Sequence, residues 1–459
     1  METFNQIISE LSSIVWGPPM LILIVLTGVL LTYKLRFIQI AKLTTGLRFA
    51  FGKKGRSNSN EGDVSPFQSL MTALAATIGT GNIVGVATAI SIGGPGALFW
   101  MWVIAFLGMA TKYSEALLAV KFRIKDEKGK MNGGPMYYIE RGMGPKWKFL
   151  AVAFAAFGSI AAFGIGNMVQ ANAVSGNVVA LMGAEGDSAK TVALVTGLVL
   201  AVLTGVVVIG GIKSIGRTAA VLVPFMASFY ILGCVYILCS FVSEIPAAFQ
   251  LVFSDAFTGT SAAGGFAGST MMIALRMGVA RGVFSNESGL GSAPIAAAAA
   301  QTDEPAEQAV ISMMGTFIDS IVVCSLTGLT LIVTGVWTEG GDVAASMAQM
   351  AFDKGMPGQF GGTLVGIAVI AFAYSTLLGW SYYGERCIEY LFGLKVIPFY
   401  RILWVVAIVV GSVGGLKLVW NIADVLNAMM ALPNLIALIA LSGIVVAETR
   451  AYWSKQKGE

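Results

Sequence analysis

The chain contains no histidine, and only 12% of its 459 residues are charged. Without histidine it lacks the commonest transition-metal ligand and the commonest general base of proteins. Its four cysteines include no CxxC pair, so the sequence predicts neither a zinc site nor a redox centre. No nucleophile stands beside a base in the pattern, which argues against an intramembrane enzyme.

Hydrophobic residues make up 56% of the chain. Its charged fraction of 12% is well below the roughly 25% of a typical soluble domain. This composition predicts an all-α membrane protein. A spanning helix needs roughly 20 mostly apolar residues. Eleven segments qualify, at residues 17–36, 67–90, 96–120, 149–182, 191–211, 219–242, 264–282, 306–336, 360–387, 398–414 and 422–447. We therefore expect about eleven transmembrane helices, followed by a tail at 448–459.

Basic residues gather on one side of the membrane if the number of spans is eleven. The loops after the first and third spans and the tail carry most of the lysines and arginines, whereas the opposite side receives Lys190, Lys354 and Lys417. Because cytoplasmic loops are enriched in lysine and arginine, we expect an outside N-terminus and a cytoplasmic C-terminus in the plasma membrane. Basic residues in short loops do not indicate nucleic-acid binding, so the expected surroundings are the lipid bilayer.

Glycines interrupt the second span at mid-membrane, where residues 79–82 read GTGN. Irregular backbone at that depth is tolerated only where it lines a cavity or is buried in protein. The amides that begin the second half of a broken helix suit a carboxylate. Carbonyls that end the first half suit sodium or an ammonium group. The alternative is close helix packing, since Gly81 and Gly85 form a GxxxG motif.

The seventh span, predicted at 264–282, begins with a second run of glycines. Interrupted segments in equivalent positions of two halves point to the binding site of a transporter. The implied architecture is two inverted five-helix repeats, at 67–242 and 264–447, preceded by an extra helix within 1–40. The Gly/Ser-rich segment 283–305 is expected to be an inner connecting loop, which is either passive or a moving gate.

Polar residues recur on one face of the fourth span. Ser159, Asn167, Gln170 and Asn177 follow helical spacing, with the apolar Phe163 on the same face. Such a stripe faces protein or water rather than lipid. The amide of Gln170 offers both a donor and an acceptor, which suits an amino-acid ligand or, alternatively, a bond between helices.

Few ionisable groups lie within the predicted spans. Glu115 follows Lys112 by one turn, which predicts a structural ion pair, whereas Asp319 has no local partner and is a functional candidate. Scarce carboxylates and absent histidine disfavour a proton relay and favour sodium. The adjacent hydroxyls of Ser375 and Thr376 suit a sodium ion or simply bond to their own helix.

The segment GGPGALFWMWVIAFLG at 93–108 resembles the signature of the alanine or glycine:cation symporter family, within the amino acid–polyamine–organocation superfamily. RGVFSNESGLGSAP at 281–294 resembles the inner loop of that family, and the resemblance runs from about residue 17 to 450. It implies a leucine-transporter-like fold and sodium-driven import of alanine or glycine. The signature aromatics Phe99, Trp100 and Trp102 are expected in an interfacial belt rather than in the site.

The resemblance also implies where the ligands bind. The substrate carboxylate is expected near the amides of Gly79, Thr80 and Gly81, and its ammonium near carbonyls of Thr77 and Thr270. The sodium ligands are expected to be Ala75, Ile78, Phe372, Ser375 and Thr376. The remaining pocket residues are expected to be Asn82, Phe163, Asn167, Gln170, Ile273 and Trp380.

A channel is the alternative to a symporter. A selectivity filter is built from a ring of equivalent groups, as an oligomer would supply. This chain offers asymmetric broken helices instead, which favour alternating access.

Overall fold

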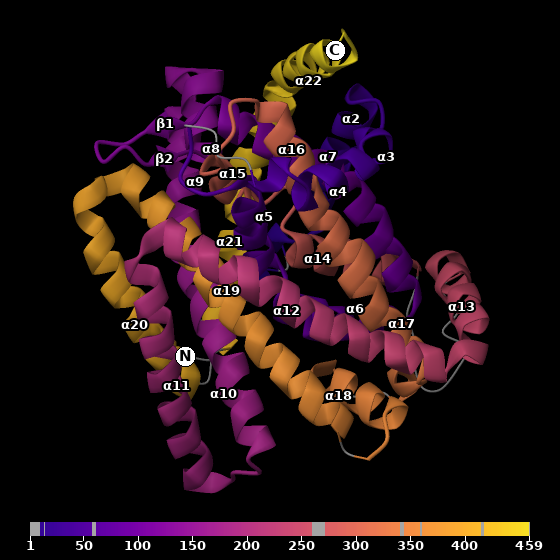
Figure 1. Ribbon diagram of the computed structural model, residues 1–459. Coiled ribbons are helices and arrows are strands. Elements are labelled where there is room, and N and C mark those ends of the chain that lie inside the picture. Colours follow the sequence, from indigo (N-terminus) through magenta and orange to yellow (C-terminus); the bar gives the residue numbers. More distant parts are fainter. Residues whose placement is uncertain are drawn as a thin grey trace.

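The computed structural model shows a bundle of helices with one short hairpin (Figure 1). It describes residues 10–12, 14–56, 61–258, 271–339, 344–358, 360–414 and 417–458. The hairpin consists of β1 (Ile124–Lys125) and β2 (Met131–Asn132), which pair antiparallel.

The α-helices are α2 (Pro18–Lys34), α3 (Ile38–Ala41), α4 (Leu43–Phe51), α5 (Pro66–Thr77), α6 (Val86–Gly93), α7 (Gly96–Lys121), α8 (Pro135–Tyr138), α9 (Lys148–Ala161), α10 (Val169–Leu181), α11 (Gly186–Ile209), α12 (Gly211–Ser240), α13 (Ile245–Thr258), α14 (Met271–Asn286), α15 (Pro294–Ala298), α16 (Pro305–Thr316), α17 (Ser325–Val333), α18 (Ala344–Gly355), α19 (Phe360–Phe392), α20 (Ile397–Val413), α21 (Lys417–Ala440) and α22 (Ser442–Gly458). Four π-helical segments are η2 (Gly81–Gly85), η3 (Ile139–Met143), η5 (Ala162–Met168) and η7 (Phe317–Cys324). Short 3₁₀ turns are η1 (Lys54–Arg56), η4 (Pro145–Trp147), η6 (Val242–Glu244), η8 (Val336–Thr338) and η9 (Leu394–Val396).

Eight helical segments within the described ranges are long and apolar enough to cross a membrane. A ninth crossing is formed by α5 and the following helical half, residues 81–93, which are bent by 55° relative to each other. The shorter helices α2 and α14 stand where the first and seventh spans are predicted. The described helices thus follow the predicted spans in order, and the all-α membrane architecture is confirmed.

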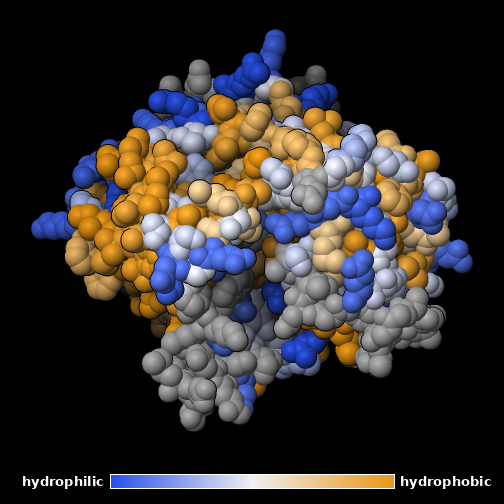
Figure 2. All heavy atoms as spheres, turned by 90° about the horizontal axis from the view of Figure 1, so that it is seen from below, coloured by the Kyte–Doolittle hydropathy of each residue, from blue (hydrophilic) through white to orange (hydrophobic). Residues whose placement is uncertain are grey.

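Apolar side chains cover the outer faces of α11 and α12. Val206, Ile209 and Phe225 are each more than 70% exposed. Exposed apolar surface of this extent suits a lipid environment rather than water. Viewed from the end opposite the hairpin, Figure 2 shows apolar surface along the rim and hydrophilic side chains around a central hollow.

The two ends of the bundle differ in charge. We call the end with the hairpin, α4 and α22 the basic end, because it carries the basic loops 42–56 and 121–148. Lys190 and Lys354 lie at the opposite, non-basic end, beside the turn between α10 and α11 and in α18. The segregation of charge expected from the sequence is therefore present for these loops. Arg281, which was expected on the basic side, departs from it, because with Arg276 it lines a cleft beside Trp16 and Asp424 at the non-basic end.

The first broken helix begins with a capping box, in which Ser65 and Gln68 satisfy each other's backbone amides. Helix α5 ends at Thr77 because Ile78 is extended, with ψ at 92°. The helix resumes at Thr80, close to the start of η2. The interruption thus lies where the glycines predict it.

A second interruption lies C-terminal to the predicted one. Residues 264–270 lie outside the described residues, and the interruption within the described chain falls at 287–293, between α14 and α15. Glu287, Gly289 and Gly291 all have positive φ there, a conformation that suits glycine and strains glutamate. Residues 285–300 are completely buried. The expected inner loop at 283–305 is therefore wrong: its first part is a broken helix in the protein interior.

Residues remote in sequence satisfy the backbone of this buried segment. Glu115 Oε1 accepts hydrogen bonds from the amides of Gly289 (3.1 Å) and Gly291 (3.2 Å). The Arg123 guanidinium donates to the carbonyls of Ala298 (3.0 Å) and Ala300 (2.7 Å). Because buried backbone groups need such partners, these contacts explain how a Gly/Ser-rich stretch can pack inside the bundle.

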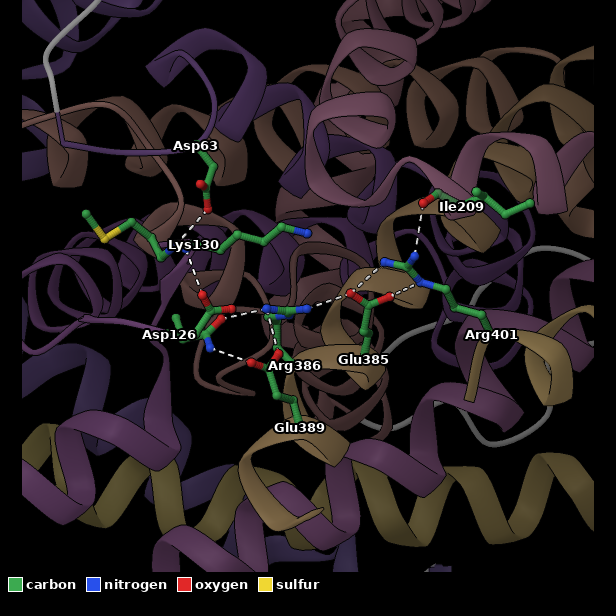
Figure 3. Close-up of polar contacts among 10 residues, drawn as sticks. Asp63, Asp126, Lys130, Ile209, Glu385, Arg386, Glu389 and Arg401 are labelled. Carbon is green, nitrogen blue, oxygen red and sulfur yellow. Dashed lines mark hydrogen bonds and ion pairs between the residues drawn. The ribbon is translucent and has the colours of Figure 1, made fainter. Parts of the chain in front are cut away.

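Buried ion pairs fix α19 and α20 at the basic end (Figure 3). Arg386 lies 2.6 Å from both Glu385 and Glu389 of its own helix, and it donates to Asn132 of β2. Glu385 also pairs with Arg401 of α20 at 2.6 Å. Breaking a buried pair of this kind leaves an uncompensated charge. This network therefore holds the long helix α19 in place against α20 and the hairpin.

The signature aromatics dock helix α13 onto α7. The Phe99 ring lies 5.6 Å from Phe253 and 5.0 Å from Phe257. The Trp100 indole donates to the carbonyl of Ala256 (3.2 Å). The side chain of Asp255 accepts from the amide of Gly96 at 2.9 Å, where α7 begins. These residues thus fasten a peripheral helix, in keeping with the expectation that they lie outside the site.

Candidate binding site between the broken helices

Oxygen atoms from α5 and α19 converge beside the first break. Ser375 Oγ lies 3.1 Å from the carbonyl oxygen of Ala75, 3.4 Å from that of Ile78 and 2.8 Å from that of Phe372. Thr376 Oγ1 donates to the carbonyl of Phe372 at 3.0 Å. All five residues predicted to hold sodium therefore meet at one place, and the hydroxyl of Thr376 also makes the alternative bond to its own helix.

The hydrogen-bond inventory of this cluster suits a cation. A hydroxyl has one proton to donate, so Ser375 can satisfy one of the three carbonyls around it. Because Thr376 already donates to the Phe372 carbonyl, the proton of Ser375 can serve either Ala75 or Ile78, and the carbonyl oxygen of the other then faces the Ser375 oxygen without a proton between them. A positive ion would stabilise this arrangement. Because the oxygens are all neutral, they suit a monovalent ion better than calcium or magnesium, which take carboxylates.

Gly79 lies in close contact with this oxygen cluster. A Cβ atom at position 79 would lie 2.6 Å from Thr376 Oγ1 and 3.9 Å from Gln170 Oε1. Thr80 Oγ1 lies 3.4 Å from the same Gln170 oxygen. The structure therefore brings the first break, Thr376 and Gln170 together, as predicted for a shared substrate and sodium site.

Asn82 and Asp319 brace the first break. The Asn82 side chain accepts from the amide of Gly79 at 2.9 Å and donates to Asp319 Oδ1 at 2.7 Å. Asp319 is fully buried in η7 and accepts further hydrogen bonds from Ser285 (2.9 Å) and Ser320 (2.8 Å). Asp319, which has no charged partner nearby in the sequence, thus bonds to both broken helices.

Phe163 and Asn167 lie elsewhere. The Phe163 ring lies 4.9 Å from Tyr400 and 5.4 Å from Trp404, and Asn167 donates to the Trp404 carbonyl at 2.9 Å. Both residues therefore contact α20 and not the first break. The π-helical segment η5 occupies residues 162–168, and its wider turn changes the helical phase on which the predicted stripe depends.

Trp380 connects α19 to the second break. Its indole donates to Glu287 Oε1 at 2.9 Å, and a Cβ atom at Gly166 would lie 2.1 Å from Trp380 Cβ. Sequence reasoning missed Glu287 and its neighbours in the second break. The signal was present, since Ser288-Gly289-Leu290-Gly291 repeats the alternating glycines of the first break.

Ile273 lines a cleft of about 430 Å³ at the non-basic end, formed along α14 by residues 273–284, by Trp16 before α2 and by Asp424 near the start of α21. Phe284 lines the same cleft, and its ring would lie 3.4 Å from a Cβ atom at Gly81. The cleft therefore leads toward the first break, with Ile273 on its wall rather than beside the predicted sodium ligands. Thr77 is buried at the end of α5, and Thr270 lies outside the described residues.

The profile of the sodium:alanine symporter family matches residues 1–459. Sodium/alanine symporter AgcS of Methanococcus maripaludis is 53% identical over 461 residues, covering 99% of each chain. The chain belongs to the sodium:alanine symporter family. Probable sodium/glutamine symporter GlnT of Bacillus subtilis is 34% identical and covers 99% of this chain and 92% of its own. The family predicted from the two motifs is confirmed, and the protein is a transporter rather than an enzyme.

Solved structures support the fold. MhsT in complex with L-phenylalanine superimposes with a TM-score of 0.62 at 15% identity, covering 85% of this chain and 93% of its own. A Na⁺-coupled sialic acid symporter in an outward-open state gives a TM-score of 0.51 at 13% identity, covering 96% and 86%. At these identities the likeness shows the fold alone, and it confirms the predicted leucine-transporter-like arrangement.

Proposed function

We propose that this family member imports alanine, and glycine less strongly, together with sodium. The observation that carries the proposal is the position of Ser375 Oγ among three backbone carbonyls of α5 and α19. The relative named as a sodium/alanine symporter shares 53% of its residues with this chain over nearly the full length. Family and geometry therefore favour the same ion.

Sodium would bind between the five oxygens of α5 and α19 and so hold the first break against the scaffold helix α19. The substrate carboxylate would meet the amides of Thr80 and Gly81, where the positive end of a half-helix dipole adds to their attraction. The ammonium would meet the carbonyl of Thr77 at the negative end of α5. Gln170 and Trp380 would form the walls of the pocket.

The second half of the proposal concerns the direction of transport. The cleft at the non-basic end leads to Phe284, while the buried segment 285–300 closes the basic end. Because basic loops favour the cytoplasm, we place the basic end inside the cell and the N-terminus outside. The cleft is then the entry from the exterior. The segments between Thr77 and the basic end must separate to release the substrate into the cell.

The test is uptake of radiolabelled alanine by purified protein in proteoliposomes. An inward sodium gradient should drive saturable accumulation above the external concentration. Replacing sodium with choline should abolish accumulation, and a proton gradient should not restore it. Equal uptake with a proton gradient and no sodium would overturn the proposal, and labelled glutamine accumulating in place of alanine would overturn the assigned substrate.

A further inference from the structure

Lys112 is a buried cation that the proposed site leaves unused and that, unlike Arg386, forms no ion pair among the described residues. It lies in the middle of α7 with 3% of its surface exposed. Its ammonium has no hydrogen-bond or ion-pair partner in the described part of the chain. The ion pair predicted with Glu115 is therefore wrong, because Glu115 Oε1 instead receives Asn434 at 2.7 Å and two backbone amides.

Lys112 lines a small cavity where both broken helices meet α7 and α16. Thr77 from the end of α5, Pro294 from the start of α15 and Ser312 from α16 line this cavity with Lys112. Its volume is about 10 Å³, roughly the space of one water molecule. The cavity therefore marks a seam between the helices that must separate beneath the first break.

This seam lies next to the proposed substrate position. Thr77 precedes Thr80 by three residues across the extended Ile78, so a carboxylate that leaves the first break needs to move by at most about 10 Å to reach the seam. A carboxylate without a partner is costly in a low-dielectric interior. An ammonium beside the seam lowers that cost by forming a charge-assisted hydrogen bond.

The alternative role for Lys112 is to balance nearby negative charge and nothing more. Glu115, Glu287 and Asp319 all act on its ammonium through space. However, none of them accepts a hydrogen bond from Lys112. Glu287 uses its two oxygens for Trp380 (2.9 Å) and Ser292 (2.6 Å). Asp319 is likewise held by Asn82 and Ser285. Glu115 keeps one oxygen, Oε2, without a hydrogen-bond partner among the described residues, so Lys112 stands between this carboxylate and the seam that it lines.

We propose that Lys112 forms a second binding site for the carboxylate of the departing amino acid, between the main site and the basic end. In the present conformation the cavity has room for about one water molecule. Separation of α5 from α15 therefore creates the site during release. The inference rests on the proposed function, since it needs an amino-acid substrate that leaves toward the basic end.

The experiment measures half-saturation for alanine from both sides, in right-side-out and inside-out membrane vesicles that contain the full chain. Lys112→Met should raise the inner half-saturation on the order of tenfold, the loss expected for a hydrogen bond to a charged group. The outer half-saturation should stay within about twofold, because the main site keeps its contacts. Lys121→Met is the matched control: Lys121 ends the same helix in a partly exposed pair with Glu448, and this variant should match the wild type on both sides.

The double variant Lys112→Met/Glu115→Gln separates substrate binding from charge balance and also covers the case in which the single variant folds poorly. Glutamine keeps an oxygen for the amides of Gly289 and Gly291 and removes the unbalanced charge. A double variant that still shows the raised inner half-saturation supports the carboxylate site. An unchanged inner value in Lys112→Met, or full recovery in the double variant, would overturn it. Absence of sodium-driven alanine uptake in the wild type would instead overturn the proposed function.

Discussion

Gly79→Ala tests the contact between the first break and the proposed sodium site. The added Cβ would lie 2.6 Å from Thr376 Oγ1, closer than packed atoms tolerate, so the threonine hydroxyl has to move. Backbone strain is not the cause, since Gly79 does not have positive φ. The expected result is weaker sodium binding, because one of the five proposed ligands is displaced.

The size of the effect follows from losing one neutral ligand. Leaving a buried polar partner unsatisfied costs about 1–3 kcal/mol, which corresponds to roughly a fivefold to 150-fold increase in the sodium half-saturation of alanine uptake. Uptake should be measured in proteoliposomes across a range of sodium concentrations at saturating alanine. Alanine affinity at saturating sodium should change much less.

Gly85→Ala is the matched control. It makes the same change in η2, and a Cβ atom at that position would meet no described atom within 4 Å. The variant should therefore transport like the wild type. Wild-type transport would also argue against the alternative that Gly85 serves close helix packing in a GxxxG motif with Gly81. Equal loss of sodium affinity in both variants would mean that the first break tolerates no added bulk and that the contact with Thr376 is not the reason.

A double-mutant cycle completes this prediction. In a Thr376→Ala background the clashing hydroxyl is absent, so Gly79→Ala should cause little further loss. Residues in contact show coupling free energies of about 0.5–3 kcal/mol in such cycles. Strictly additive effects on the sodium half-saturation would refute the assignment of the contact.

Four further outcomes are expected. Ser375→Ala should weaken sodium binding by about 1–3 kcal/mol, seen as a higher sodium half-saturation when uptake is measured at varied sodium. An unchanged half-saturation would show that Ser375 does not bind sodium. Gln170→Ala should weaken alanine binding by purified protein while sodium affinity persists, and wild-type binding would make Gln170 structural. Asp319→Asn should weaken both ligands in the same assays, since it loosens the partner of Asn82, and an unchanged variant would show that this bond does not brace the break. Glycine should compete with labelled alanine somewhat less well than alanine does, because a missing methylene is worth only about 1–3 kcal/mol, whereas strong competition by leucine would contradict a small pocket.

The first break was predictable because its signal is local. Glycines at 79 and 81 stand with polar residues inside an apolar span, where interrupted backbone must line a cavity or be buried in protein. The sodium ligands were harder to predict, since Ala75 and Ser375 are 300 residues apart. Their pairing came from the resemblance to a known family and not from periodicity.

The break at 287–293 was missed for the opposite reason. Residues 287–293 are as polar as an exposed loop, and only contacts from remote helices make their burial possible. Glu115 and Asn434, which bond to Gly289, cannot be connected with it from sequence alone. Phe163 was misplaced because a regular helical period was assumed across the π-helical segment η5.

The most direct test of the account is the reverse coupling of the two ligands. Linkage requires that an alanine gradient drive sodium just as a sodium gradient drives alanine. Proteoliposomes containing the wild type should take up ²²Na⁺ when alanine is added outside, and Ser375→Ala should do so much less at low sodium. If inward alanine movement carries no ²²Na⁺ in the wild type, sodium is not the coupled ion and the proposed site between α5 and α19 has another role.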